Sequence, residues 1–239
     1  MSSRNSVFDT KTLAETWQGV ASIIDHTNLR PEATPAQIVR LCEEAREFGF
    51  VTVMINACHV ARASSELRGS AVKVGAVVGF PFGATLTSVK VFETKEVLKL
   101  GAREIDMVIN IGAVKAGESD VVRSDIRALA EVVHADSALL KVILEMGLLT
   151  QEEKLLACQL SESAGADFVK TSTGFLGGGA TVEDVELMRR SVKVGVKASG
   201  GIRTADDAKR MIHAGANRLG TSGGVAIIGE LRNSAAGAK

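Results

Sequence analysis

The chain has 239 residues, of which 46% are hydrophobic and 24 are glycine, so it can form one large core with many tight turns. Its 28 basic and 28 acidic side chains balance to a formal net charge of +0. No basic excess is present to hold a polyanion, which argues against a nucleic-acid-binding protein and against a membrane-surface binder.

Cysteine content and apolar segments bear on the compartment. The three cysteines, Cys42, Cys58 and Cys158, are odd in number and lack CxxC spacing, which fits a reducing compartment and no zinc site. No apolar signal segment opens the sequence, and the longest apolar run (74–86) is too short and too interrupted by Gly and Pro to span a bilayer. We therefore expect a cytoplasmic protein that needs no metal and no other cofactor.

Eight strand-like runs follow one another along the chain, and a segment with a helical pattern follows each of them. In chain order they are SIIDHT (22–27), FVTVMIN (50–56), VKVGAVVGF (72–80), EIDMVIN (104–110), LLKVILEM (139–146), FVKTST (168–173), VGVKAS (194–199) and NRLGTS (217–222). Residues 1–20 are expected to form a short helical extension, and residues 231–239 a flexible tail.

Glycine and threonine mark the boundaries of these elements. Glycines that end a helical pattern before a strand are Gly49, Gly101, Gly165 and Gly215. Threonines that precede an acidic or amide residue by three positions, as in a capping box or its Asp variant, are Thr34, Thr150, Thr181 and Thr204. Eight strand–helix units predict a single-domain (β/α)8 TIM barrel over residues 1–239. A doubly wound sheet is the alternative, but SIIDHTNLRP lacks the Gly-rich turn usual after its first strand.

Alternation along the strands predicts charged side chains on the barrel axis. In VGVKAS, Val194 and Val196 suit the helix layer, which leaves Lys197 facing inward. The same alternation in the preceding strands turns four more charged side chains inward: Asp106, Lys141, Glu145 and Lys170. Two acids and three lysines are too many charges for a packing core. We interpret Lys141 and Glu145 as an ion pair that supports a reactive site above them.

Two inward lysines on adjacent strands indicate amine chemistry. An exposed lysine has a pKa of ~10.4 and is almost wholly protonated at neutral pH. Burial and a second ammonium both lower the pKa of a lysine, and a depression of ~3 units corresponds to roughly 4 kcal/mol. The neutral amine then attacks a carbonyl and forms a Schiff base. Lys170 and Lys197 form such a pair, Asp106 could move protons directly or through a water, and the pattern does not decide which lysine attacks.

A simpler interpretation is that inward lysines only balance carboxylates, and for one lysine alone we would favour it. Two lysines on adjacent strands, each followed by a small polar turn containing glycine, weigh against it. The turns VKASGGIRT (196–204) and LGTSGG (219–224) also match the place where barrels bind phosphate through backbone N–H groups. Arg203 either pairs with that anion or is solvated.

Four motifs together resemble the class I deoxyribose-phosphate aldolases, a Schiff-base-forming family on a (β/α)8 barrel: EIDMVINIGAVKAG, ADFVKTSTGF, VGVKASGGIRT and LGTSGGVAI. The resemblance runs from about residue 24 to residue 227. It implies reversible cleavage of 2-deoxy-D-ribose 5-phosphate to D-glyceraldehyde 3-phosphate and acetaldehyde. It assigns the Schiff base to Lys170, the lowering of the pKa of Lys170 to Lys197, and water-mediated proton transfer to Asp106.

The resemblance also implies the binding residues. Phosphate and substrate positions are expected at Thr173, Gly174, Gly200, Gly201, Gly220, Ser222 and Gly223. Asp25 and Thr27 match positions near the sugar hydroxyl. The family often reads GTSSGVAI, so Gly223 removes one hydroxyl that could hold the phosphate. Some members carry a tail tyrosine that assists proton transfer, and this chain has 0 tyrosines, so we predict intact imine chemistry with a slower proton-transfer step.

Three rival functions are weighed. One is another Schiff-base aldolase or transaldolase with a different phosphorylated donor, and another is a sugar-phosphate-binding barrel without chemistry. A metal-dependent aldolase is disfavoured because His and carboxylate ligands are not clustered in the sequence. The expected partners are small phosphorylated sugars and aldehydes, and a second copy of the chain in a homo-oligomer, for which we expect a dimer.

Overall fold

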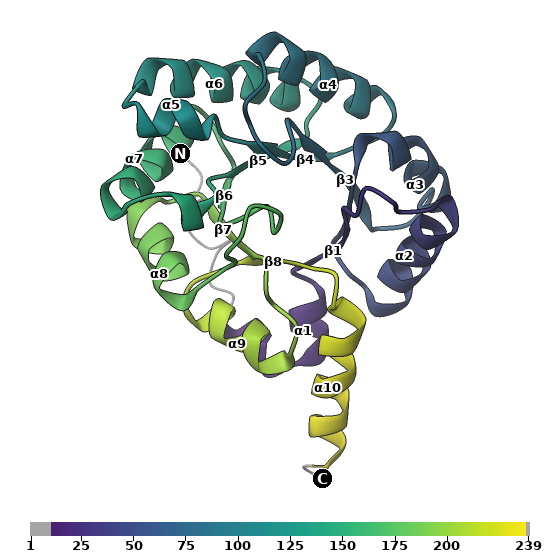
Figure 1. Cartoon of the computed structure of the whole chain (residues 1–239). Coiled ribbons are helices and arrows are strands. Elements are labelled where there is room, and N and C mark those ends of the chain that lie inside the picture. The colour runs from purple at the N-terminus through teal and green to yellow at the C-terminus, as the bar shows by residue number, and fades with distance from the viewer. Residues whose placement is uncertain (1–10, 238–239) are drawn as a thin grey trace, which may run out of the picture.

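A computed structural model describes residues 11–237 of the chain. Eight parallel strands pair in chain order, and β1 also pairs with β8, so the sheet closes into a barrel (Figure 1). The strands are β1 (Ile24–Asn28), β2 (Thr52–Ile55), β3 (Lys73–Val78), β4 (Glu104–Val108), β5 (Leu139–Ile143), β6 (Phe168–Lys170), β7 (Gly195–Ser199) and β8 (Arg218–Thr221). The (β/α)8 prediction is confirmed, and so is each of the eight strands.

Helices form an outer ring, and at least one follows every strand (Figure 1). The α-helices are α1 (Trp17–Ala21), α2 (Pro35–Phe48), α3 (Val60–Glu66), α4 (Thr87–Lys99), α5 (Ile111–Lys115), α6 (Ser119–Ala135), α7 (Gln151–Ser163), α8 (Val182–Ser191), α9 (Ala205–His213) and α10 (Gly224–Gly237). Short 3-10 helices are η2 (Lys11–Glu15), η3 (Ala57–His59) and η4 (Met146–Leu148). Within residues 11–237, no helix is both long enough and apolar enough to cross a membrane.

Local sequence explains where the helices begin and end. Thr34, Thr150 and Thr204 each form a reciprocal capping box, in which side chain and backbone satisfy each other at the N-terminus. Thr181 caps α8 in one direction, since its side chain accepts from the backbone N–H of Asp184. The four predicted helix-ending glycines all have positive φ, between 71° and 111°.

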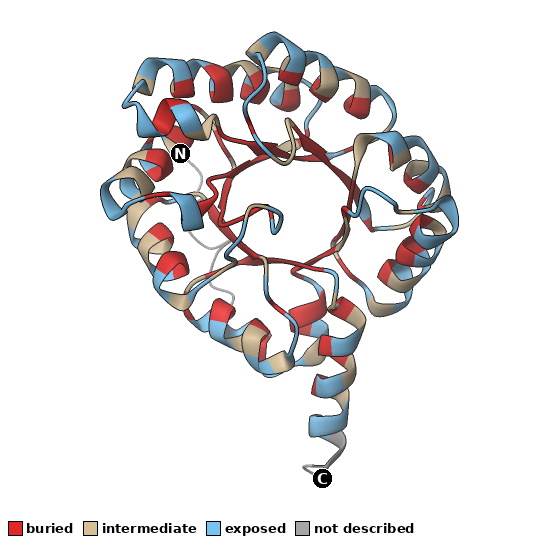
Figure 2. Cartoon of the chain, viewed as in Figure 1, coloured by how far each residue is buried: buried red, intermediate tan, exposed pale blue. Residues whose placement is uncertain are grey.

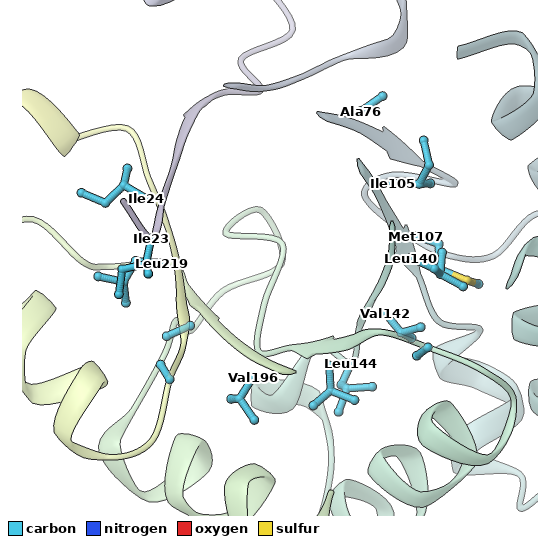
Figure 3. Close-up of a cluster of buried hydrophobic side chains, with 14 of the residues drawn as sticks. Ile23, Ile24, Ala76, Ile105, Met107, Leu140, Val142, Leu144, Val196 and Leu219 are labelled. Carbon is cyan, nitrogen blue, oxygen red and sulfur yellow. The ribbon is translucent and has the colours of Figure 1, made fainter. Parts of the chain in front are cut away.

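The hydrophobic core lies between the strands and the helices. Buried residues line the sheet and the inner faces of the helices (Figure 2). Side chains such as Ile105, Met107, Leu140, Val142 and Val196 are 0% exposed and point away from the barrel axis (Figure 3). Each such side chain contributes roughly 1.5–3 kcal/mol of hydrophobic stabilisation. Because the outward positions carry the core, the inward positions are free for polar residues.

The two ends of the described chain are helical. The predicted N-terminal extension forms η2 and α1, which contact α9 and α10, and residues 1–10 lie outside the described range. Residues 231–237, expected in a flexible tail, instead continue α10, which extends away from the ring at its C-terminal end (Figure 1). Their composition, with two alanines after Ser234 and no proline, allows the helix to continue.

Candidate active site

Seven charged side chains fill the interior of the barrel, and we call them the axial cluster. They are Asp25 on β1, Glu104 and Asp106 on β4, Lys141 on β5, Lys170 on β6, Lys197 on β7 and Arg218 on β8. Each of these residues is at most 8% exposed. The predicted group of Asp106, Lys141, Lys170 and Lys197 is therefore brought together, because all four lie on the inward face of consecutive strands.

Asp106 stands at the centre of the three lysines. Its Oδ2 atom accepts hydrogen bonds from Lys170 Nζ at 2.9 Å and from Lys197 Nζ at 2.8 Å. Its Oδ1 atom accepts from Lys141 Nζ at 2.9 Å. Burial alone raises the pKa of Asp106, but the ammonium groups of Lys141, Lys170 and Lys197 hold that pKa well below its ordinary value. Asp106 is therefore a carboxylate that touches both predicted catalytic lysines.

Asp25 occupies a deeper position than the resemblance implied. Its carboxylate accepts from Lys197 Nζ, and from an Arg218 guanidinium nitrogen at 2.7 Å. Burial raises the pKa of Asp25, yet the cations Lys141, Lys197 and Arg218 outweigh burial and lower it. Asp25 is 0% exposed and is not among the residues that line the cavity described below, whereas Thr27 is.

The predicted ion pair between Lys141 and Glu145 is wrong. Lys141 Nζ instead lies 2.5 Å from Glu104 and 3.5 Å from Asp25, besides its bond to Asp106. Glu145 lies beyond the end of β5, at φ 57° and ψ 60°, so strand alternation no longer decides where its side chain points. Its Oε2 atom accepts from the Thr173 N–H at 3.0 Å, which fixes the start of the loop after β6.

Lys170 is the lysine of the cluster that reaches open space. Burial lowers the pKa of Lys170, Asp106 opposes the shift, and the Lys197 ammonium adds to it, which brings the pKa to about 8. Lys170 lines a cavity of about 680 Å³, whereas Lys197 is 0% exposed and does not line it. The residue pattern left open which lysine attacks a carbonyl, and the family resemblance assigned that role to Lys170. Access to the cavity favours Lys170.

The cavity lies over the strand ends where the predicted binding turns meet. Its lining includes the predicted residues Thr27, Lys170, Thr173, Gly174, Gly200, Gly201, Gly220 and Ser222. Gly223 is not part of the lining but follows Ser222 directly and donates its N–H to Thr221 Oγ1 at 2.9 Å. Arg203, His26 and Arg30 also line the cavity, and His26 is buried with Nε2 2.7 Å from Glu44.

Glycine is required in the turn after β7 for conformational reasons. Gly200 and Gly201 have φ values of 91° and 80°, a region that a side chain makes costly. Both glycines line the cavity, and they precede the N-terminus of α9 by a few residues. Backbone N–H groups near a helix N-terminus favour an anion.

Two members of the axial cluster, Glu104 and Arg218, were not predicted from the sequence. Arg218 bonds Glu104 Oε2 at 3.0 Å as well as Asp25. Period-two alternation could have found both, because Glu104 precedes Asp106 by two positions and Arg218 precedes Gly220 by two. Across residues 11–237, no group of three or more His, Cys, Asp or Glu side chains is arranged to hold a metal ion.

Comparison with known proteins places this geometry in a family. The model of the DeoC/LacD family aldolases matches residues 19–231. The chain belongs to this aldolase family. It is 56% identical over 218 residues to deoxyribose-phosphate aldolase of Geobacillus sp. (strain WCH70), covering 90% of this chain and 97% of that one. It is 54% identical to deoxyribose-phosphate aldolase of Bacillus subtilis (strain 168), covering 87% of this chain and 94% of that one.

Solved structures agree with this assignment. The chain superposes on the deoxyribose phosphate aldolase of Aeropyrum pernix, described as a tetramer, with a TM-score of 0.88. The two are 32% identical, and the match covers 98% of this chain and 100% of that one. The predicted family is thus confirmed, and the chain is a lyase of the aldolase type.

Proposed function

We propose that this aldolase reversibly cleaves 2-deoxy-D-ribose 5-phosphate to D-glyceraldehyde 3-phosphate and acetaldehyde through a Schiff base on Lys170. The observation that carries the role of Lys170 is its position: a lysine with a pKa lowered to about 8 lines the cavity and touches Asp106. Relatives at 54% and 56% identity carry the name of this activity, which supports the choice of substrate.

The reaction proceeds from the neutral amine of Lys170. Its Nζ lone pair attacks C1 of the open-chain aldehyde, and loss of water gives an imine whose protonated form withdraws electrons. A base then removes the proton of the C3 hydroxyl, the C2–C3 bond breaks, and glyceraldehyde 3-phosphate leaves. The remaining enamine takes a proton at C2, and water hydrolyses the imine to acetaldehyde and the free lysine.

Asp106 and Lys197 serve the proton transfers in this proposal. Asp106 Oδ2 bonds both lysines, so a proton taken up there is within hydrogen-bond reach of Lys170 and Lys197. A water in the cavity would connect Asp106 with the substrate atoms. General acid–base catalysis of this kind contributes typically 10²–10⁴-fold in rate.

The phosphate group is proposed to bind at the turns after β7 and β8. Gly200, Gly201 and Ser222 line the same cavity as Lys170, and Gly220 lies beside them. The first residues of the loop after β6, Thr173 and Gly174, are proposed to complete this binding wall. Thr27, on β1 beside β8, is proposed to stand near a sugar hydroxyl, and Asp25 to act from beneath through Lys197.

Borohydride trapping with acetaldehyde, followed by peptide mass mapping, tests the proposal. We expect an ethyl group on Lys170, and none on Lys170 when borohydride is omitted. An adduct on Lys197 instead would show that Lys197 forms the Schiff base and that Lys170 is the lysine that assists it. No adduct on either lysine would overturn the Schiff-base mechanism and favour a sugar-phosphate-binding barrel.

The choice of donor needs a separate measurement. Parallel trapping with dihydroxyacetone phosphate and with pyruvate distinguishes an acetaldehyde-dependent enzyme from another Schiff-base aldolase or a transaldolase. We expect the adduct on Lys170 to form with acetaldehyde in preference to both. Preferential trapping of dihydroxyacetone phosphate or pyruvate would contradict the proposed substrate.

We also propose that the chain forms a homodimer in the cytoplasm. Its exposed large apolar side chains include a group on the β3–α4 loop and α4: Phe82, Leu86, Val89 and Phe92. Apolar groups gathered on one surface favour association between proteins. Cys42, Cys58 and Cys158 carry free thiols, as expected in a reducing compartment.

A further inference from the structure

The axial cluster has an imbalance of charge when all its members are ionised. Three carboxylates, on Asp25, Glu104 and Asp106, face four cations, on Lys141, Lys170, Lys197 and Arg218. Every one of these residues is at most 8% exposed. A net charge buried in a protein interior is costly, so the cluster is most stable when one cation gives up its proton.

The ion pairs show which cation gives up its proton at least cost. Lys141 contacts all three carboxylates, and Lys197 contacts Asp25 and Asp106. Arg218 contacts Asp25 and Glu104. A guanidinium is not deprotonated in proteins. Lys170 contacts Asp106 Oδ2, an oxygen that it shares with Lys197. Deprotonation of Lys170 therefore breaks fewer ion pairs than deprotonation of any other cation in the cluster.

We propose that Arg218 and Glu104 are positioning residues that set the protonation state of Lys170 by fixing the charge balance of the axial cluster. Neither residue lines the cavity. This inference rests on the proposed role of Lys170 as the amine that forms the Schiff base. It assigns a role in the chemistry to two side chains that do not reach the substrate.

The contacts form a continuous path from Arg218 to Lys170. Arg218 bonds Asp25 Oδ1 at 2.7 Å, and Asp25 Oδ2 accepts from Lys197. Lys197 in turn bonds Asp106 Oδ2 at 2.8 Å, where Lys170 also bonds. Without Arg218, Asp25 interacts more strongly with Lys197, so Lys197 interacts less with Asp106. Asp106 then stabilises the protonated form of Lys170 more strongly.

Removal of Glu104 acts in the opposite direction. Lys141 lies 2.5 Å from Glu104 and 2.9 Å from Asp106, so loss of the Glu104 charge leaves Lys141 to bind Asp106 more fully. Asp106 is then less able to stabilise an ammonium on Lys170. The other charged groups around Lys170 are Lys197 on β7 and Lys141 on β5, while Glu145 bonds the Thr173 N–H.

The test measures how the reactivity of Lys170 depends on pH in whole-chain variants. Acetaldehyde with cyanoborohydride is applied from pH 6 to pH 10, and ethylation of Lys170 is quantified by peptide mass spectrometry against the exposed Lys193. Three variants are compared with the unaltered chain: Arg218→Met, Arg218→Lys and Glu104→Gln. The conservative Arg218→Lys variant keeps the charge and changes only the geometry.

We expect opposite shifts from opposite charges. From a pKa of about 8, a shift of about one unit upward in Arg218→Met lowers labelling at pH 7 about tenfold. The same shift downward in Glu104→Gln raises labelling at pH 7 about fivefold. In Arg218→Lys, labelling of Lys170 should have the same pH midpoint as in the unaltered chain, because the charge is kept. If Arg218 acted only through its geometry, this variant would shift the midpoint as well.

A matched control removes another ion pair outside the barrel interior. Lys154 bonds Asp184 at 2.6 Å between α7 and α8, and Lys154→Met should leave the midpoint for Lys170 unchanged. The inference would be overturned if the pH midpoint of Lys170 labelling shifted in the same direction in Arg218→Met and Glu104→Gln, or shifted in neither. Should Arg218→Met not fold, an unshifted Glu104→Gln overturns it. Absence of any label on Lys170 in the unaltered chain would instead overturn the proposed function.

Discussion

Buried Lys170 is in balance between its neutral form, which reacts with a carbonyl, and its protonated form, which pairs with Asp106. It is 3% exposed, and burial and the neighbouring ammonium of Lys197 favour its neutral form. Asp106 opposes both effects, so the pKa stops at about 8 rather than falling further. An amine with a pKa near the working pH exists in both states, as a group that attacks a carbonyl and then exchanges protons must.

The first prediction concerns pH. Because only neutral Lys170 attacks, and its pKa is about 8, kcat/KM for cleavage should fall about tenfold for each pH unit below that value and level off above it. Initial rates at low substrate concentration between pH 5.5 and pH 9.5 check this. A profile that is flat from pH 6 to pH 9 would show that Lys170 does not limit the reaction of the free enzyme.

The second prediction concerns Gly223→Ser, which introduces the second serine of the GTSSGVAI motif that is common among deoxyribose-phosphate aldolases. A Cβ at Gly223 would lie 3.4 Å from Thr221 Oγ1 and 3.7 Å from Arg203, so it fits without displacement. A hydroxyl that bonds a charged phosphate is worth about 1.5 kcal/mol or more, which predicts a KM for the phosphorylated substrate about tenfold lower. Steady-state kinetics of Gly223→Ser and of the unaltered chain measures this change in KM.

Gly223→Ala is the control for that substitution, because it adds the Cβ without the hydroxyl. We expect its KM to equal that of the unaltered chain. An equal decrease in KM for Gly223→Ala and Gly223→Ser would show that rigidity of the turn, and not a hydrogen bond to phosphate, causes the change.

At the scale of elements, the loop after β6 depends on a residue that strand alternation placed wrongly. Glu145 is 0% exposed, lies in the left-handed region of backbone conformation, and accepts the Thr173 N–H at 3.0 Å. A non-glycine residue in this region costs of order 1–3 kcal/mol and persists where the surroundings determine it. The bond to Thr173 joins the loop after β5 to the wall proposed to hold the phosphate group.

The third prediction follows from that bond. Glu145→Ala should raise KM for 2-deoxyribose 5-phosphate about tenfold, because the Thr173 turn loses a charged acceptor worth about 1.5 kcal/mol or more. KM for unphosphorylated 2-deoxyribose should change little. Glu145→Gln keeps an oxygen acceptor and should lie close to the unaltered chain. Equal losses with both substrates in Glu145→Ala would indicate general damage to the site.

For the whole molecule, the exposed apolar group on α4 and the loop before it bears on assembly. Phe82, Leu86 and Phe92 are 64%, 71% and 65% exposed. Large apolar side chains on one surface are stabilised when a second molecule covers them. We therefore expect these residues to lie within the proposed homodimer interface.

The fourth prediction tests that interface. Phe92→Glu should shift the chain from dimer to monomer in sedimentation-velocity experiments, because it places a carboxylate where apolar surface is buried. Leu155→Glu, on α7 at 41% exposure, is the matched control and should leave the mass unchanged. A dimer that persists in Phe92→Glu, or dissociates equally in Leu155→Glu, would contradict the placement of the interface.

Much of the barrel follows from local sequence. Threonine caps and glycine ends mark the helices, and apolar alternation marks the strands, because both depend on backbone geometry within a few residues. The same alternation brings Asp106, Lys170 and Lys197 to the barrel axis, since each lies inside a regular strand. It fails at Glu145, which lies beyond the end of β5, where the chain turns to a positive φ.

Local sequence patterns were enough to predict the eight strand–helix units and the inward lysines. The closed barrel was needed to show that Lys170 reaches the cavity and which carboxylates Lys141 and Lys197 bind. Lys197 meets Asp25 because closure of the barrel brings β1 beside β8, and Arg218 joins Asp25 to Glu104 across the interior. These partners are more than one hundred residues apart, so their choice depends on how the sheet closes and not on local backbone preference.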